Sequence, residues 1–68
     1  MILRDFFDSF IIRDEMEVSI YNDKKLLVEY EPVTRIFSKY KKLLNKEVSY
    51  IDLDHHNDMT WIMIVIKD

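Results

Sequence analysis

The sequence predicts one small α+β domain over residues 1–68, with a mostly antiparallel four-stranded sheet packed with two helices. The clearest signal is the unbroken apolar run from Trp61 to Ile66. A run this short and this rich in β-branched and aromatic side chains is typical of a strand at the centre of a sheet. Residues 16–21 alternate between apolar and polar side chains, the pattern of a half-buried strand. Residues 2–11 and 32–44 instead repeat apolar side chains every three to four positions, which indicates helices.

The first half of the chain predicts a helix followed by a hairpin. The helix, residues 2–11, has an apolar stripe made of Leu3, Phe6, Phe7 and Phe10. In the strand over 16–21, one side carries Met16, Val18 and Ile20, and the other carries Glu17, Ser19 and Tyr21. A turn over 22–25 leads to a strand over 26–31, with Leu26, Val28 and Tyr30 on one side and Leu27, Glu29 and Glu31 on the other.

The second half repeats this order. Pro32 favours a helix start, and the helix is expected to run to about Leu44 with an apolar stripe of Val33, Ile36, Phe37, Tyr40, Leu43 and Leu44. A strand over 47–53 alternates imperfectly, which predicts a bulge or two-sided burial near Tyr50 and Ile51. Residues 54–58 are expected to form the turn, and 60–67 the last strand. The element order is therefore α-β-β-α-β-β.

Length and composition limit the function classes. A chain of 68 residues with no cysteine has a marginal core and no disulfide to support it, so we expect a homodimer. The absence of glycine excludes glycine-rich phosphate loops and leaves tight turns to Asn and Asp. No segment resembles a signal peptide or a membrane span, so we expect a cytoplasmic protein without membrane contact. We expect neither a cofactor nor an enzymatic activity.

The sharpest motif candidate for chemistry lies at residues 52–58, where carboxylates and imidazoles are concentrated. Imidazole with carboxylate suits divalent transition metals. Within this segment the triplet Asp54, His55 and His56 resembles the signature of the DHH phosphoesterases, although the resemblance covers these residues alone. Such enzymes need further carboxylates spread over a much larger chain. The competing interpretation, a solvated polar turn, is the one we favour.

Charge is distributed unevenly. Residues 32–46 carry +5 and no acid, which leaves −8 for the rest of the chain. The cations of this basic helix are Arg35, Lys39, Lys41, Lys42 and Lys46. They make nucleic-acid binding an alternative function. Acidic residues on or beside the first hairpin would instead suit a basic protein surface, and they are Asp14, Glu15, Glu17, Glu29 and Glu31.

The faces of the sheet bear on partners directly. If both helices cover one face, an apolar patch remains on the other, and such patches usually mark contact surfaces. Its expected members are Tyr21, Leu27, Tyr50 and one side of the last strand, either Trp61, Met63 and Val65 or, if Ile64 faces outward, Ile62, Ile64 and Ile66. If one helix covers each face, the monomer is self-sufficient. The first arrangement is favoured because it explains a dimer.

The whole pattern resembles small uncharacterised proteins encoded by phages and prophages of low-GC Gram-positive bacteria. The resemblance lies in the order of elements, in the strand ending Ser19-Ile20-Tyr21-Asn22-Asp23, in the segment Asn45-Lys46-Glu47-Val48 and in the apolar last strand. This sequence departs from that pattern in lacking glycine at its turns. The resemblance implies a cytoplasmic accessory protein that inhibits or modulates a host defence or regulatory protein. Our leading hypothesis is thus a non-enzymatic protein-binding module.

Overall fold

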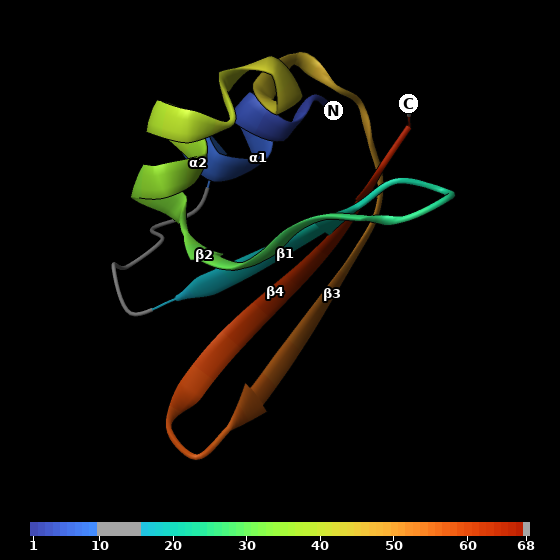
Figure 1. Cartoon of the computed structure of the whole chain (residues 1–68). Coiled ribbons are helices and arrows are strands. Elements are labelled where there is room, and N and C mark those ends of the chain that lie inside the picture. Colours follow the sequence, from blue (N-terminus) through green and yellow to red (C-terminus); the bar gives the residue numbers. More distant parts are fainter. Residues whose placement is uncertain (10–15, 68) are drawn as a thin grey trace.

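The structure, a computed structural model, describes residues 1–9 and 16–67. Its elements follow the expected order (Figure 1). They are α1 (Leu3–Ser9), β1 (Glu17–Tyr21), β2 (Leu26–Pro32), α2 (Val33–Lys39), the 3-10 helix η1 (Lys41–Asn45), β3 (Val48–His56) and β4 (Met59–Ile66).

The strands form one four-stranded sheet in the order β2-β1-β4-β3. The outer pairs, β1 with β2 and β3 with β4, are antiparallel hairpins. The two hairpins meet through β1 and β4, which run parallel. The sheet is therefore mixed, though antiparallel in two of its three pairings as expected. The apolar run lies in β4, an interior strand, which confirms the central position that its composition predicted.

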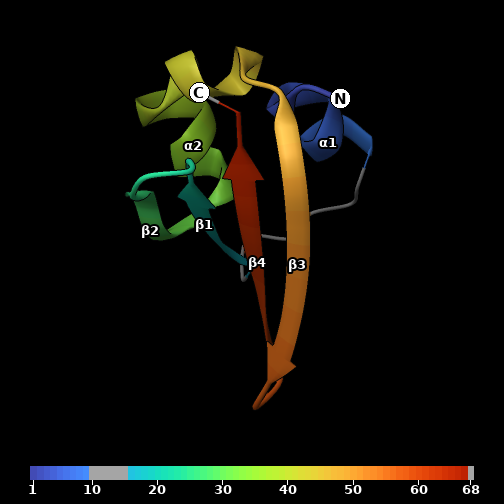
Figure 2. The same ribbon diagram turned by 90° about the vertical axis from the view of Figure 1, so that its right-hand side faces the viewer.

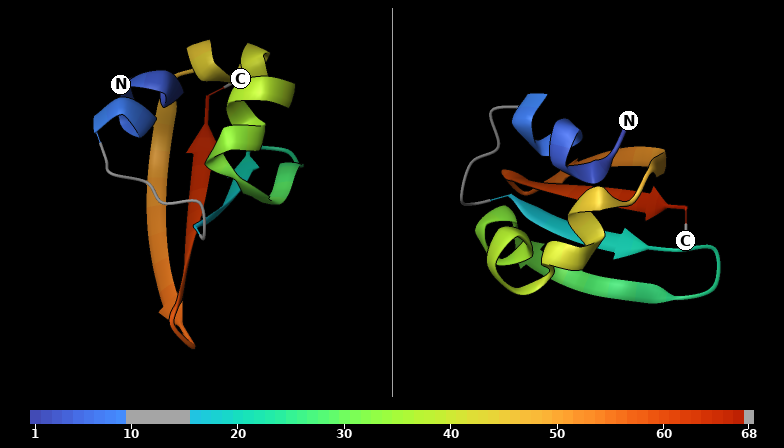
Figure 3. Two further views of the ribbon diagram at one scale, coloured as in Figure 1. Left: turned by 90° about the vertical axis from the view of Figure 1, so that its left-hand side faces the viewer. Right: turned by 90° about the horizontal axis from the view of Figure 1, so that it is seen from above.

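Both α1 and the α2–η1 segment lie on the same face of the sheet (Figures 2 and 3). The tip of the β3–β4 hairpin extends away from them. The core between the two layers is made of Leu3, Phe6, Phe7, Val18, Ile20, Val28, Ile36, Leu44, Ile62, Ile64 and Ile66. The face of β4 that carries its three isoleucines therefore points toward the helices.

Of the two helix arrangements left open by the sequence, the structure has the one with both helices on one face. Ile64 is 0% exposed, so it belongs to the core and not to a contact surface. Its inclusion among partner-binding residues was wrong. Leu27 is partly buried and packs against the same core, which also removes it from the outer patch.

The turns use Asn and Asp, as the lack of glycine predicts. In the first hairpin Oδ1 of Asn22 accepts hydrogen bonds from the backbone N–H groups of Lys24 and Lys25, both at 2.8 Å. In the second, Asn57 and Asp58 have positive φ angles of 51° and 62°. Positive φ at both central residues defines the two-residue turn that matches strand twist best. This turn is shorter than the expected 54–58, because β3 continues to His56.

The expected helix over 32–44 is interrupted. Tyr40 leaves helical geometry, with φ −117° and ψ 40°, between α2 and η1. Beyond it the chain winds more tightly, with Leu43 N–H bonded to the carbonyl of Tyr40 at 3.0 Å. The apolar stripe nevertheless packs as predicted, since Leu44 is buried and Leu43 packs against the core. Periodicity identified the inward positions and missed the change of winding.

Two strands contain irregularities that shift their pairing register. In β3 the register shifts between Val48 and Tyr50, which confirms the bulge expected near Tyr50. In β2 the register shifts twice relative to β1. The alternation expected for residues 26–31 therefore breaks down, and Tyr30, expected on the side of Val28, is 56% exposed while Val28 is buried.

Candidate binding face of the sheet

The face of the sheet opposite the helices is covered by no helix or strand of residues 1–9 and 16–67. We call it the open face. Alternation along β4 places Trp61, Met63 and Val65 on it. The pairing of β1 with β4 adds Glu17, Ser19 and Tyr21, and the pairing of β3 with β4 adds Tyr50, Asp52 and Asp54. Aromatic and carboxylate side chains thus share one exposed surface.

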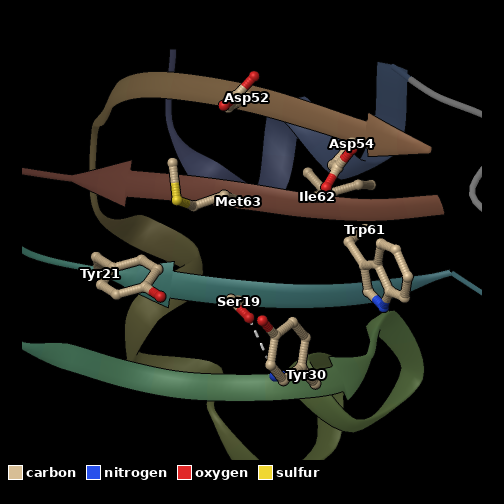
Figure 4. Close-up of a pocket in the computed structure, with 8 residues that line it drawn as sticks. All are labelled: Ser19, Tyr21, Tyr30, Asp52, Asp54, Trp61, Ile62 and Met63. Carbon is tan, nitrogen blue, oxygen red and sulfur yellow. Dashed lines mark hydrogen bonds between the residues drawn. The ribbon is translucent and has the colours of Figure 1, made fainter. Parts of the chain in front are cut away.

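A hollow of about 180 Å³ lies near the middle of this face (Figure 4). It is lined by residues from all four strands: Ser19, Tyr21, Tyr30, Asp52, Asp54, Trp61, Ile62 and Met63. We call it the Ser19 hollow. It exists because the small side chain of Ser19 lies between larger neighbours, with Met63 directly across on β4 and Tyr21 two residues along β1.

The position of Tyr30 follows from the bulge in β2. Val18 pairs with Glu31 and Ile20 with Val28, so Glu29 and Tyr30 both stand opposite Ser19. Tyr30 has a φ of 46°, in the left-handed region that a residue with a Cβ enters at an energetic cost. Its backbone N–H donates to Oγ of Ser19 at 3.1 Å. That bond satisfies a donor that the bulge removes from the regular ladder.

The strand β3 contributes the negative charge. In its register with β4, Asp54 stands opposite Trp61, and Asp52 opposite Met63. A second, more open hollow of about 380 Å³ shares Tyr30, Asp54 and Trp61 with the first and adds Glu17 and Met59. The described residues that line either hollow include no Lys or Arg. Positive charge is therefore the charge that this surface favours.

The Asp54-His55-His56 triplet lies in β3, not in a turn. Successive side chains of a strand point to opposite faces, so His55 points away from the face that carries Asp54 and His56. The ring of His56 lies 6.4 Å from that of Trp61, whereas Nδ1 of His55 is 3.1 Å from Oγ1 of Thr60. Within residues 1–9 and 16–67, no group of three or more His, Asp or Glu side chains is placed to hold a metal ion.

The acidic residues proposed for partner binding are dispersed. Glu17 lies on the open face beside Trp61. Glu29 is exposed on the outer strand β2. Glu31 is half-buried, and one of its oxygens lies 3.8 Å from Nε of Arg35. Asp14 and Glu15 lie outside the described residues.

The cations lie on the helical side of the molecule. Arg35, Lys39, Lys41 and Lys42 are exposed on α2 and η1, while Lys46, just after η1, is half-buried. Nζ of Lys39 is 5.6 Å from the centre of the Tyr40 ring. A shallow hollow of about 540 Å³ is lined by Leu27, Ser38, Lys39, Tyr40, Lys41, Lys42 and Leu43. The cations of α2 and η1 thus lie on the opposite side of the sheet from Asp52 and Asp54.

Sequence reasoning did not single out Ser19 or Tyr30, and it named Trp61 and Met63 only as one of two possible outward sides of their strand. Alternation had grouped Trp61 with Met63, but without saying which face of β4 is covered. The decisive information is the parallel pairing that sets Ser19 beside Met63. In the chain β1 and β4 are separated by β2, α2, η1 and β3, so no local pattern predicts their register.

No protein-family model, curated protein or solved structure matches this chain. Among the described residues, no helix is both long enough and apolar enough to cross a membrane.

Proposed function

We propose that this protein is a non-enzymatic binding module whose open face docks onto another protein. The observation that carries the proposal is the composition of that face. Tyr30 and Tyr50 are 56% and 54% exposed, and the half-buried Tyr21, Trp61 and Met63 lie on the same surface. Tyrosine, tryptophan and methionine are among the residues enriched at protein interfaces, and the two aromatic residues bury a large area for few rotatable bonds.

The helical layer behind the open face also supports docking. The helical layer packs against the back of the sheet through the buried core, so we expect the open face to need little ordering on binding. A small, rigid surface of this kind suits a protein that occupies a partner's own site. The proposal therefore includes inhibition or modulation of that partner, the role implied by the resemblance to small phage proteins.

A homodimer through the same face is the competing arrangement. It would set Glu17, Asp52 and Asp54 of two copies against one another, and like charges that share an interface oppose association. Self-association would then be stronger at high salt, because salt screens this repulsion. A basic partner would bind more weakly at high salt, because salt screens the attraction. Light scattering at low and high salt separates these cases. We expect a basic partner to bind the open face more tightly than a second copy of the protein does.

The proposal is tested by photocrosslinking in the cells that encode the protein. Benzoylphenylalanine replaces Tyr50 on the open face in one variant and the exposed Lys41 of η1 in a second. We expect a discrete crosslinked adduct from position 50, its loss when Asp54→Lys is added, and no such adduct from position 41. Equal adducts from both positions, or adducts from position 41 alone, would contradict docking through the open face.

The alternative function is nucleic-acid association through the basic helix. One observation favours it: the exposed cations of α2 and η1 lie on the opposite side of the sheet from Asp52 and Asp54, so these carboxylates do not face the same ligand. This function predicts retention on DNA that falls steeply with salt and with Lys41→Glu plus Lys42→Glu. Salt-independent retention, or retention unchanged in the double variant, would exclude it.

A further inference from the structure

We propose that the Ser19 hollow receives the guanidinium group of an arginine from the partner. This inference rests on the proposed docking function and specifies what the centre of the open face recognises. It is carried by three features of the hollow, namely its shape, its aromatic rim and its charge.

The shape of the hollow fits a side chain better than a flat surface. Ser19 is 5% exposed and forms the floor, while Tyr21, Tyr30 and Trp61 rise around it (Figure 4). A water molecule takes about 30 Å³ of the liquid, so a hollow of about 180 Å³ has room for the planar end of one long side chain. A partner residue inserted here would be surrounded on several sides, as binding anchors usually are.

The rim favours a cation. The faces of aromatic rings attract Lys and Arg, most strongly for Trp, and three aromatic residues border this hollow. Asp54 lies across from Trp61, and Asp52 lies across from Met63, so the carboxylates occupy one wall and the rings the others. A cation held between them contacts ring faces and carboxylate oxygens together.

Arginine matches this arrangement better than lysine does. Its guanidinium is planar, so it stacks on a ring and at the same time presents a fork of N–H donors to a carboxylate. It is also more weakly hydrated than an ammonium group, which favours transfer into a partly apolar hollow. A lysine would bring the same charge without the stacking plane.

The backbone at Tyr30 supports a binding role for this ring. A φ of 46° at a tyrosine is unfavourable, and the bulge that imposes it places the ring at the rim of the hollow. Strain of this kind persists where the surrounding structure fixes it, and it is concentrated at ligand-binding sites. The 56% exposure of the Tyr30 side chain limits what the ring adds to the core.

The test uses Trp61, the only tryptophan of the chain, as a fluorescent reporter in the hollow. A short neutral peptide with one central arginine is titrated into the protein, beside the same peptide with citrulline, which keeps the shape of arginine and lacks its charge. We expect the arginine peptide to change Trp61 fluorescence at a concentration at least about tenfold lower than citrulline requires. A lysine peptide is expected to fall between them.

Two variants keep Trp61 in place and change the hollow. Asp54→Asn and Tyr30→Gly are each expected to weaken the arginine peptide several-fold, while Asp8→Asn, an exposed carboxylate on α1, leaves its binding unchanged. Circular dichroism confirms that each variant is folded.

Equal responses to arginine and citrulline, or no response to either, would overturn this inference. Crosslinking from position 50 would still stand in that case, so a failure of arginine recognition is distinguishable from a failure of docking through the open face.

Discussion

Tyr30 and Ser19 are linked by a hydrogen bond of 3.1 Å from the backbone N–H of Tyr30 to Oγ of Ser19, across a bulge in which two residues of β2 face one of β1. Ser19 is thus the floor of the hollow and also the acceptor for a backbone N–H that the bulge removes from the regular ladder. We therefore expect stability and the proposed binding to depend on the same small side chain.

Replacing this serine is expected to destabilise the fold. In Ser19→Ala the Tyr30 N–H loses its acceptor in a part-buried position, which lowers the free energy of unfolding by about 1–2 kcal/mol. Urea denaturation followed by circular dichroism measures the change. The matched control, Ser49→Ala at an exposed position of β3, should stay within about 0.5 kcal/mol of the parent. Equal effects of the two substitutions would show that the hydrogen bond contributes nothing.

Replacing Tyr30 with glycine, in contrast, is expected to weaken peptide binding without lowering stability. Glycine accepts a φ of 46° without the steric penalty of a Cβ, so Tyr30→Gly is expected to leave the free energy of unfolding unchanged or raise it by about 1 kcal/mol. The same variant loses the ring from the rim of the hollow and weakens binding of the arginine peptide. Thermal unfolding and the Trp61 titration measure the two effects. A large loss of stability would mean that the Tyr30 ring supports the core.

The second hairpin offers a similar test that leaves the hollow alone. Asp58 has a φ of 62° in a two-residue turn, where Asn-Gly is the preferred pair. Asp58→Gly is expected to raise the free energy of unfolding by about 0.5–1 kcal/mol. Asp58→Ala removes the same charge but keeps a Cβ, so it should not stabilise. Denaturation curves for both variants decide the point, and stabilisation by alanine would assign the effect to charge instead of backbone geometry.

The assignment of the two faces of β4 can be tested by neighbouring truncations. Ile64→Ala removes a fully buried side chain and is expected to lower the free energy of unfolding by about 2–5 kcal/mol. Met63→Ala, on the open face, should lower it by less than about 1.5 kcal/mol, because the side chain is only half-buried. A larger effect at Met63 than at Ile64 would invert the proposed inside and outside of the sheet.

Much of this fold is predictable from local pattern. The helical stripe with Phe6 and Phe7, the strand with Val18 and Ile20, and the apolar last strand all pack as their periodicity indicates. Even the bulge near Tyr50 is visible, because alternation fails there. Each of these features follows from the spacing of apolar side chains within a single helix or strand.

The candidate site depends on how separate elements pair and pack, which the spacing of side chains within one element does not indicate. The choice of face by the helices decides that Ile64 is core and Trp61 is surface. The bulge that turns Tyr30 outward leaves β2 with an ordinary-looking alternation, so the sequence predicted the wrong side for that residue. The parallel register of β1 and β4 brings Ser19 to Met63 from positions far apart in the chain.

The central claim, that the open face is the binding surface, is tested most directly by mapping amide chemical shifts during titration with the arginine peptide. The account predicts that the Trp61 indole N–H and the amides of Ser19, Tyr30 and Asp54 move, while those of α2 and η1 stay in place. Shifts confined to α2 and η1, or spread evenly over the protein, would contradict it.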